Sequence, residues 1–214
     1  MLFSIPLVLF NFYAAFSGLT YVEDFYYALY EVILTTWAIC FYLFLEVDVD
    51  PSHKDASRPG TFLAEHYKHC REVVIQPIYK KLMLWALYAW YSGAVLFFVS
   101  FHSYGLLSNG DSGVVNSSGK IDGLWTAGFT SFTILLAAHH VIIFVSTRSY
   151  SIPLVLGYIF SVVCFMPITV LLNELVPSTM MYSTTFSDVL SQPLYWAVVL
   201  VGTTAICMPY FFVK

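Results

Sequence analysis

Residues 124–172 read LWTAGFTSFTILLAAHHVIIFVSTRSYSIPLVLGYIFSVVCFMPITVLL, and Arg148 is the only Asp, Glu, Lys or Arg among them. A helix needs about 20 apolar residues to cross the hydrocarbon core of a bilayer. The stretch therefore predicts two transmembrane helices, at residues 124–147 and 152–172, joined by a short turn around Arg148. A pair of this kind indicates an all-α membrane protein.

Four further apolar stretches have a similar length, at residues 2–20, 25–45, 82–101 and 194–213. Glu31 is the only charged residue within them. Only 10% of the chain is charged and 59% is hydrophobic, whereas soluble domains carry roughly 25% charged residues. We therefore expect residues 1–214 to form a single domain, a polytopic transmembrane helix bundle of about six spans. The net charge of −4 and the lack of a basic face argue against a nucleic-acid partner.

The distribution of cations predicts the orientation. With six spans, every Lys and Arg except Lys120 falls on one side of the membrane: Lys54, Arg58, Lys68, Arg71, Lys80, Lys81, Arg148 and Lys214. The positive-inside rule makes that side the cytosol. Both termini and the loop 46–81 are then cytosolic, and the loops 102–123 and 173–193 are exoplasmic. Asn116, in an Asn-Ser-Ser triplet, is a candidate glycosylation site on the exoplasmic side.

Glu31 is the outstanding candidate for a functional residue. Ionisable groups inside a span are costly and usually face the bundle interior, a cavity or a partner. Thr35 lies four residues further on and so shares a helix face with Glu31, with Thr36 beside it. The three would form a polar stripe about 7 Å long in an α-helix. The alternative is that Glu31 snorkels to the membrane interface and the threonines bond the carbonyls of their own helix.

Histidines offer a different reading, a membrane protein that binds haem. His139 and His140 lie in the cytosolic half of their span, whereas His102 ends the preceding span on the outer side. A membrane haem requires two histidines at matched depth on facing helices, so histidines bonded within the bundle are favoured. We find no nucleotide loop, metal cluster or nucleophile–base pair in the sequence, and thus no catalytic residue and no bound cofactor in this chain.

A more specific signal lies between Asn11 and Asp50. This stretch contains Phe16-Ser17-Gly18, Glu23-Asp24-Phe25-Tyr26, Leu29-Tyr30-Glu31-Val32, Thr35-Thr36 and Glu46-Val47-Asp48-Val49-Asp50. It resembles the type IV P-type ATPases, the phospholipid flippases, which read Phe-Ser-Gly-Gln, Tyr-Asp-Asp-Trp-Tyr, Tyr-Asn-Val, Phe-Thr-Ser-x-Pro and Asp-Gln-Asp-Val-Ser at the same spacing. Weaker similarity extends over nearly the whole chain, at Trp85, Ser92, Phe97-Phe98, Thr147 to Ser151 and Pro209-Tyr210-Phe211.

The resemblance implies that the chain corresponds to the last six spans of an ATP-driven flippase, which moves phospholipid from the exoplasmic to the cytosolic leaflet. The full-length family member uses Mg and ATP. The phosphorylated aspartate and the nucleotide-binding domain are not among these residues, so we expect no ATP hydrolysis by this chain alone. It would be part of a larger polypeptide, or a degenerate or separately encoded half. The resemblance also implies a eukaryotic plasma membrane or endomembrane, and an accessory two-span glycoprotein subunit.

The chain departs from the family pattern at the position of most interest. Glu31 stands where the family has Asn, and Ala38, Leu19 and Phe25 stand where it has Pro, Gln and Trp. The family's Asn and the nearby Thr lie near the translocated headgroup, which implies a headgroup path at Glu31, Thr35 and Thr36. A carboxylate there would suit a zwitterionic or amine-bearing lipid better than phosphatidylserine. The alternative from another functional class is a catalytically inert membrane scaffold or accessory subunit derived from such a transporter.

Overall fold

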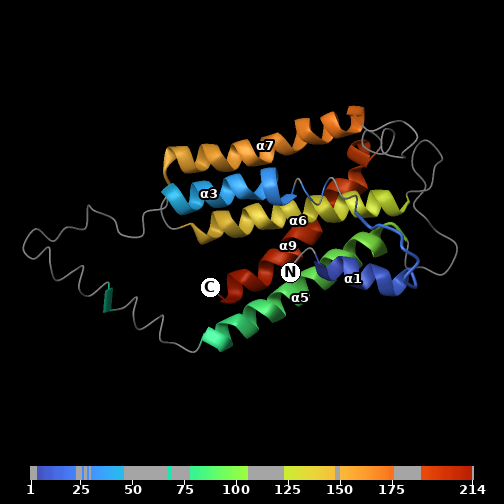
Figure 1. The fold of residues 1–214 in the computed structure, drawn as a ribbon, viewed down its shortest axis with the longest axis horizontal. Helices are drawn as coiled ribbons and strands as arrows, with labels where there is room; N and C mark the ends of the chain where they lie inside the picture. The colour runs from blue at the N-terminus through green and yellow to red at the C-terminus, as the bar shows by residue number, and fades with distance from the viewer. Residues whose placement is uncertain are drawn as a thin grey trace, which may run out of the picture.

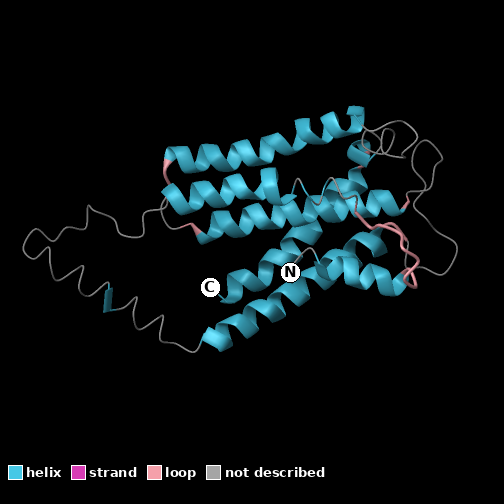
Figure 2. Cartoon of the chain, in the orientation of Figure 1, coloured by secondary structure: helices cyan, strands magenta, loops and turns pink. Residues whose placement is uncertain are grey.

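The computed structural model describes residues 4–22, 26, 28, 30–45, 67–68, 78–105, 123–147, 150–175 and 189–213. The regular secondary structure in these ranges is helical (Figure 1 and Figure 2). The elements are α1 (Ser4–Tyr13), the π-helix η1 (Tyr30–Thr35), α3 (Thr36–Leu45), α5 (Ile78–Ser103), α6 (Leu124–Ser146), α7 (Ile152–Leu175) and α9 (Pro193–Val213). Asn116, Arg148 and Lys214 lie outside the described residues, as does most of the predicted cytosolic loop.

Four of the described helices, α5, α6, α7 and α9, are long and apolar enough to cross a membrane. The shortest of them, α9, has 21 residues, which corresponds to about 30 Å at 1.5 Å per residue. All four coincide closely with predicted spans, and α6 and α7 begin at the predicted residues, Leu124 and Ile152. The surface fits a lipid environment, because large apolar side chains such as Phe44 and Ile152 are 84% and 78% exposed.

The helix predicted at residues 2–20 is shorter than expected, because α1 ends at Tyr13. The N–H of Phe16 donates to the Asn11 carbonyl oxygen at 2.9 Å, and that of Ala15 to the Phe12 carbonyl oxygen at 3.4 Å. This pair of bonds is a Schellman motif, in which the residue after the cap adopts a left-handed conformation. Ala15 has that conformation, with φ at 49°, where glycine is the usual residue. The prediction of one helix through residue 20 was therefore wrong.

The segment predicted as an α-helix at residues 25–45 is also interrupted. Tyr30–Thr35 form a π-helix, and a regular α-helix follows only at Thr36–Leu45. A π-helix bonds residue i to i+5 instead of i+4, so side chains project differently from those of an α-helix. The stripe length predicted for Glu31 to Thr36 assumed α-helical geometry and does not apply here.

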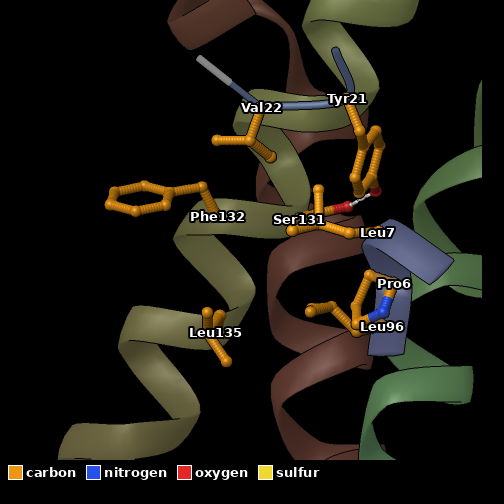
Figure 3. Close-up of a pocket in the computed structure, with 8 residues that line it drawn as sticks. All are labelled: Pro6, Leu7, Tyr21, Val22, Leu96, Ser131, Phe132 and Leu135. Carbon is orange, nitrogen blue, oxygen red and sulfur yellow. Dashed lines mark hydrogen bonds between the residues drawn. The ribbon is translucent and has the colours of Figure 1, made fainter. Parts of the chain in front are cut away.

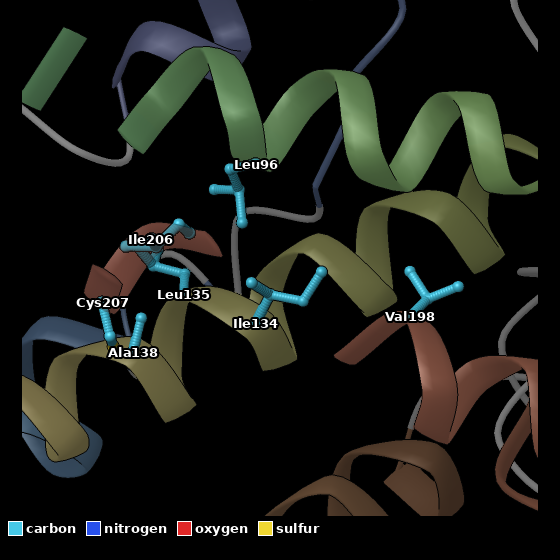
Figure 4. Packing of buried hydrophobic residues seen from close by; sticks show 7 residues of the cluster. All are labelled: Leu96, Ile134, Leu135, Ala138, Val198, Ile206 and Cys207. Carbon is cyan, nitrogen blue, oxygen red and sulfur yellow. The ribbon is translucent and has the colours of Figure 1, made fainter. Parts of the chain in front are cut away.

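α6 lies at the centre of the bundle and contacts α9, α5, α7, α3 and η1. Buried side chains of α5, α6 and α9 meet in one cluster, which Figure 4 shows: Leu96, Ile134, Leu135, Ala138, Val198, Ile206 and Cys207. Glycines let the helices approach closely. A Cβ atom at Gly202 of α9 would lie 2.8 Å from Cδ1 of Ile134, and one at Gly93 of α5 would lie 2.6 Å from Cβ of Ile5. Small residues at contacts are typical of helices that pack within a membrane.

Two tyrosines of α5 donate hydrogen bonds to backbone carbonyls of α9 near Pro209. Pro209 has no N–H, so the carbonyl of Ala205, four residues earlier, lacks its helical partner. The Tyr91 hydroxyl donates to this oxygen at 3.2 Å, and the Tyr88 hydroxyl donates to the next carbonyl oxygen, that of Ile206, at 2.9 Å. The two tyrosines therefore satisfy backbone groups in a setting where water is scarce.

The helices alternate in direction along the bundle. α3, α6 and α9 end at the left side of Figure 1, and α5 and α7 begin there. The exposed residues Lys80 and Lys81 belong to the first turn of α5, and so lie at this end of the bundle.

Candidate functional site

The π-helix η1 holds the residues that the sequence singled out. Glu31 lies within η1, but its side chain is outside the described part of the structure. Thr35 is the last residue of η1 and is buried, with 5% of its surface exposed, and its Oγ1 donates to the carbonyl oxygen of Tyr30 at 2.8 Å. Thr36 begins α3 and is exposed. The two threonines thus lie in different environments and do not form one buried polar surface.

Aromatic contacts hold η1 against α6 and α7. The ring of Tyr30 packs against Phe132 and His139 of α6, with centroids 6.0 Å and 6.1 Å away. Tyr26 packs against Phe132 at 5.2 Å, and Phe165 of α7 joins the same cluster. Rigid aromatic packing of this kind can stabilise a π-helix that the backbone alone would not prefer.

The hydrogen bond of Thr35 bears on the alternative reading of the polar stripe. A threonine that bonds a carbonyl of its own helix satisfies its hydroxyl without a ligand. The Thr35 bond is of this type, although it spans five residues instead of the usual four. It also ties the last residue of η1 to the first. Thr35 therefore has a structural role in maintaining η1.

A buried hydroxyl cluster, which the sequence analysis missed, lies between α5, α6 and the residues before η1. The Tyr21 hydroxyl bonds Ser131, as Figure 3 shows. It also bonds Ser100 at 3.0 Å, and the hydroxyl oxygens of the two serines are 2.5 Å apart. A cavity of about 10 Å³ adjoins Tyr21 and Ser131, with Leu96 and Pro6 among its walls. That volume is near the minimum for one water molecule. Serines in two predicted spans were the only signal in the sequence.

α6 pairs further hydroxyls with tyrosines of other segments. Tyr104 bonds Thr130 Oγ1 at 2.9 Å, and Tyr195 of α9 donates to Thr133 Oγ1 at 2.9 Å. Each threonine also donates to the carbonyl four residues earlier in α6. Buried polar groups need such partners, because an unpaired one costs about 1–3 kcal/mol. The cluster and these two pairs fix the tyrosines on α6.

We expect Tyr21→Phe to lower the free energy of unfolding by about 1 kcal/mol, since it removes a hydroxyl from two buried hydrogen bonds. Ser100 and Ser131 would still bond each other, so the loss should not be larger. Thermal unfolding in detergent micelles measures the change. The control is Tyr150→Phe, at an exposed tyrosine that bonds the Phe144 carbonyl, where we expect less than about 0.5 kcal/mol. Equal losses for the two variants would contradict a stabilising role for the cluster.

The histidines of α6 do not form a haem site with the rest of the described residues. His140 is bonded within the bundle, with Nδ1 2.8 Å from the Leu136 carbonyl oxygen and Nε2 2.8 Å from Ser161 Oγ of α7. The Nε2 atom of His139 is buried and has no hydrogen-bond partner. In the described residues, His, Cys, Asp and Glu side chains form no group that could hold a metal ion.

A family model described as phospholipid-translocating P-type ATPase C-terminal matches residues 1–214. Comparison with curated proteins gives no match. The apolar helices of the structure agree with a membrane protein of this family, whose full-length members use Mg and ATP as P-type ATPases. The chain therefore belongs to the phospholipid-translocating P-type ATPase C-terminal family, and it is an integral membrane part of such an ATPase.

Proposed function

We propose that η1 borders the path of a phospholipid headgroup moving from the exoplasmic to the cytosolic leaflet, with Glu31 and Thr36 nearest the headgroup and the buried Thr35 supporting them. The observation that carries the proposal is the π-helix itself, because it interrupts a membrane segment at the one acidic residue of the predicted spans. π-Helical turns occur frequently at functional sites, and ionisable residues in membrane segments mark substrate paths.

The role of each residue follows from its environment. Thr35 acts as a positioning residue, since its bond to the Tyr30 carbonyl maintains the π-turn. Thr36 is exposed on the surface of the bundle, where a headgroup or another part of the ATPase can reach it. Glu31 would supply charge selection, and a carboxylate at that position disfavours anionic headgroups.

The test is ATP-dependent lipid transport by the intact ATPase reconstituted in liposomes, read as removal of a fluorescent phospholipid from the outer leaflet. We expect Thr35→Ala to slow transport about fivefold, the equivalent of roughly 1 kcal/mol from one hydrogen bond. The control is Thr204→Ala, because Thr204 of α9 also bonds carbonyls of its own helix, at 2.9 Å, but lies far from η1 in the sequence.

The outcomes separate the candidate functions. Slower transport in Thr35→Ala with unchanged transport in Thr204→Ala supports a path at η1. Equal transport in both variants would remove Thr35 from the site. A wild-type protein that transports no phospholipid, although it is folded and in the membrane, would favour the inert scaffold or accessory subunit.

We also propose six spans with both termini cytosolic, supported by the cations of the sequence and by the helix ends gathered beside Lys80 and Lys81. The two ends of α5 provide a test in a Cys70→Ser background. A membrane-impermeant maleimide added to intact cells should label His102→Cys, and should label Lys81→Cys only after permeabilisation. Both side chains are exposed, so burial would not explain the difference. Labelling of Lys81→Cys in intact cells would show that the chain has the opposite orientation in the membrane.

A further inference from the structure

A groove runs between α6 and α7 on the outer surface of the bundle. It has a volume of about 360 Å³. Its rims are apolar side chains about half exposed: Phe144 of α6, at 46%, and Ile159, Val162 and Val163 of α7, at 54%, 51% and 58%. The groove is therefore open toward the surroundings of the bundle, which for a membrane protein are lipid.

The floor of the groove contains polar residues whose polar atoms are paired inside the protein. His140 is 8% exposed and uses both ring nitrogens, on the Leu136 carbonyl and on Ser161. Tyr158 is 7% exposed and its hydroxyl bonds Thr147 Oγ1 at 2.8 Å. Because these polar atoms are paired, the surface of the groove consists of apolar carbon atoms. A headgroup or another polar ligand would find no partner here, whereas a hydrocarbon chain needs none.

The lining also distinguishes a lipid tail from another helix. Where helices of this chain approach closely, a glycine lies at the contact, as at Gly93, Gly202 and Gly157 of α7, which lies against Phe41 of α3. Membrane helices generally meet at small residues. The residues that line the groove are Val, Ile, Phe, Tyr and His, with no Gly, Ala or Ser. The volume of about 360 Å³ can hold a stretch of one acyl chain.

The end of the groove near the α6–α7 turn has an aromatic border. The Tyr150 ring packs against Phe144 with centroids 5.0 Å apart, and its hydroxyl donates to the Phe144 carbonyl oxygen at 2.8 Å. Tyr150 is 54% exposed. Tyrosines of this kind are typical of the membrane–water interface. A lipid anchored at this interface would extend its tail along the groove toward the bundle centre.

We propose that the groove between α6 and α7 binds one acyl chain of a phospholipid from the leaflet at the α6–α7 turn. This is a site for a resident lipid, at the contact of α6 with α7. It rests on the membrane location of the chain and is independent of a headgroup path at η1.

Photo-crosslinking tests the proposal. The intact ATPase is placed in lipid nanodiscs that contain a small fraction of phosphatidylcholine with a diazirine in its acyl chain, and labelled peptides are mapped by mass spectrometry. We expect residues 159–163 to be labelled at least threefold more than Leu200 and Val201, two lipid-exposed residues of α9 that line no described groove. Val163→Trp fills the groove and should reduce its labelling at least threefold. The matched control Val201→Trp, at a residue 55% exposed, should leave it unchanged.

Each outcome has a defined meaning. Equal labelling of the groove and of α9 in the wild type would show ordinary surrounding lipid and overturn the proposal. A groove that is unlabelled because another part of the ATPase covers it would overturn it as well. The wild-type map decides these two cases even if Val163→Trp fails to fold, and Val163→Phe then serves as the smaller filling variant. Undiminished labelling in a folded filling variant would also exclude the groove as the binding site.

Discussion

Replacing Gly128 with alanine is expected to lower the free energy of unfolding by about 2–3 kcal/mol, the upper range for overpacking a buried site. Gly128 lies in α6 and is buried. A Cβ atom there would overlap the backbone carbonyl oxygen of Tyr21. Backbone atoms cannot rotate away as the end of a flexible side chain can. Tyr21 is also held in place through its hydroxyl by Ser100 and Ser131, so the clash can be relieved only by moving a segment.

Gly123→Ser is the matched control for this prediction. Gly123 is the N-cap of the same helix, and a Cβ atom there would meet nothing within 4 Å. Serine is also a favoured residue at an N-cap, so the change should be neutral or slightly stabilising. Thermal unfolding of both variants in detergent micelles makes the comparison. If Gly128→Ala unfolds at the wild-type temperature, the close approach of Tyr21 to α6 is not a feature of the protein.

Glu31→Asn is expected to raise the uptake of phosphatidylserine relative to phosphatidylcholine by about tenfold in the intact ATPase. The flippase family has asparagine at this position, and the substitution removes a negative charge from the proposed headgroup path. Two charges 4 Å apart at an effective dielectric of 20 interact by about 4 kcal/mol, so relief of a third of that repulsion gives a factor of about ten. Transport of the two fluorescent lipids, measured in parallel, gives the ratio.

Two further variants at Glu31 isolate the effect of charge. Glu31→Gln keeps the length of the side chain without its charge and should raise the ratio as Glu31→Asn does. Glu31→Asp keeps the charge and should leave the ratio near that of the wild type. If Glu31 instead snorkels to the interface, as the alternative holds, all three variants should show the wild-type ratio at normal protein levels. That result would remove Glu31 from the headgroup path while leaving the family assignment intact.

Much of the candidate site could be located from the sequence, but its form could not. Glu31 and Thr35 were identified because an acidic residue in an apolar stretch is conspicuous, and both lie in η1. The π-helix itself gave no sequence signal, since it depends on the packing of Tyr30 against Phe132 and His139 of a helix about a hundred residues away. Thr35 is buried and Thr36 is exposed, a difference that the sequence pattern did not predict.

The four long helices needed no tertiary information. Apolar length and the lack of charge are local properties, and the transfer free energies of successive residues add along a segment. This is why α5, α6, α7 and α9 appear where the sequence predicted them. The membrane class and the family resemblance depended on the same kind of local pattern, and the family match over residues 1–214 agrees with them.

Contacts between distant segments were decided only by the fold. α1 ends at Tyr13 because the chain turns there, which lets Tyr21 reach Ser100 and Ser131, 79 and 110 residues away. The groove between α6 and α7 likewise has an apolar lining because His140 and Tyr158 pair their polar atoms internally. Which hydroxyls pair and which surfaces remain apolar depends on the faces that the helices turn toward one another. That choice is set by packing over the whole bundle, and a linear pattern of apolar residues does not encode it locally.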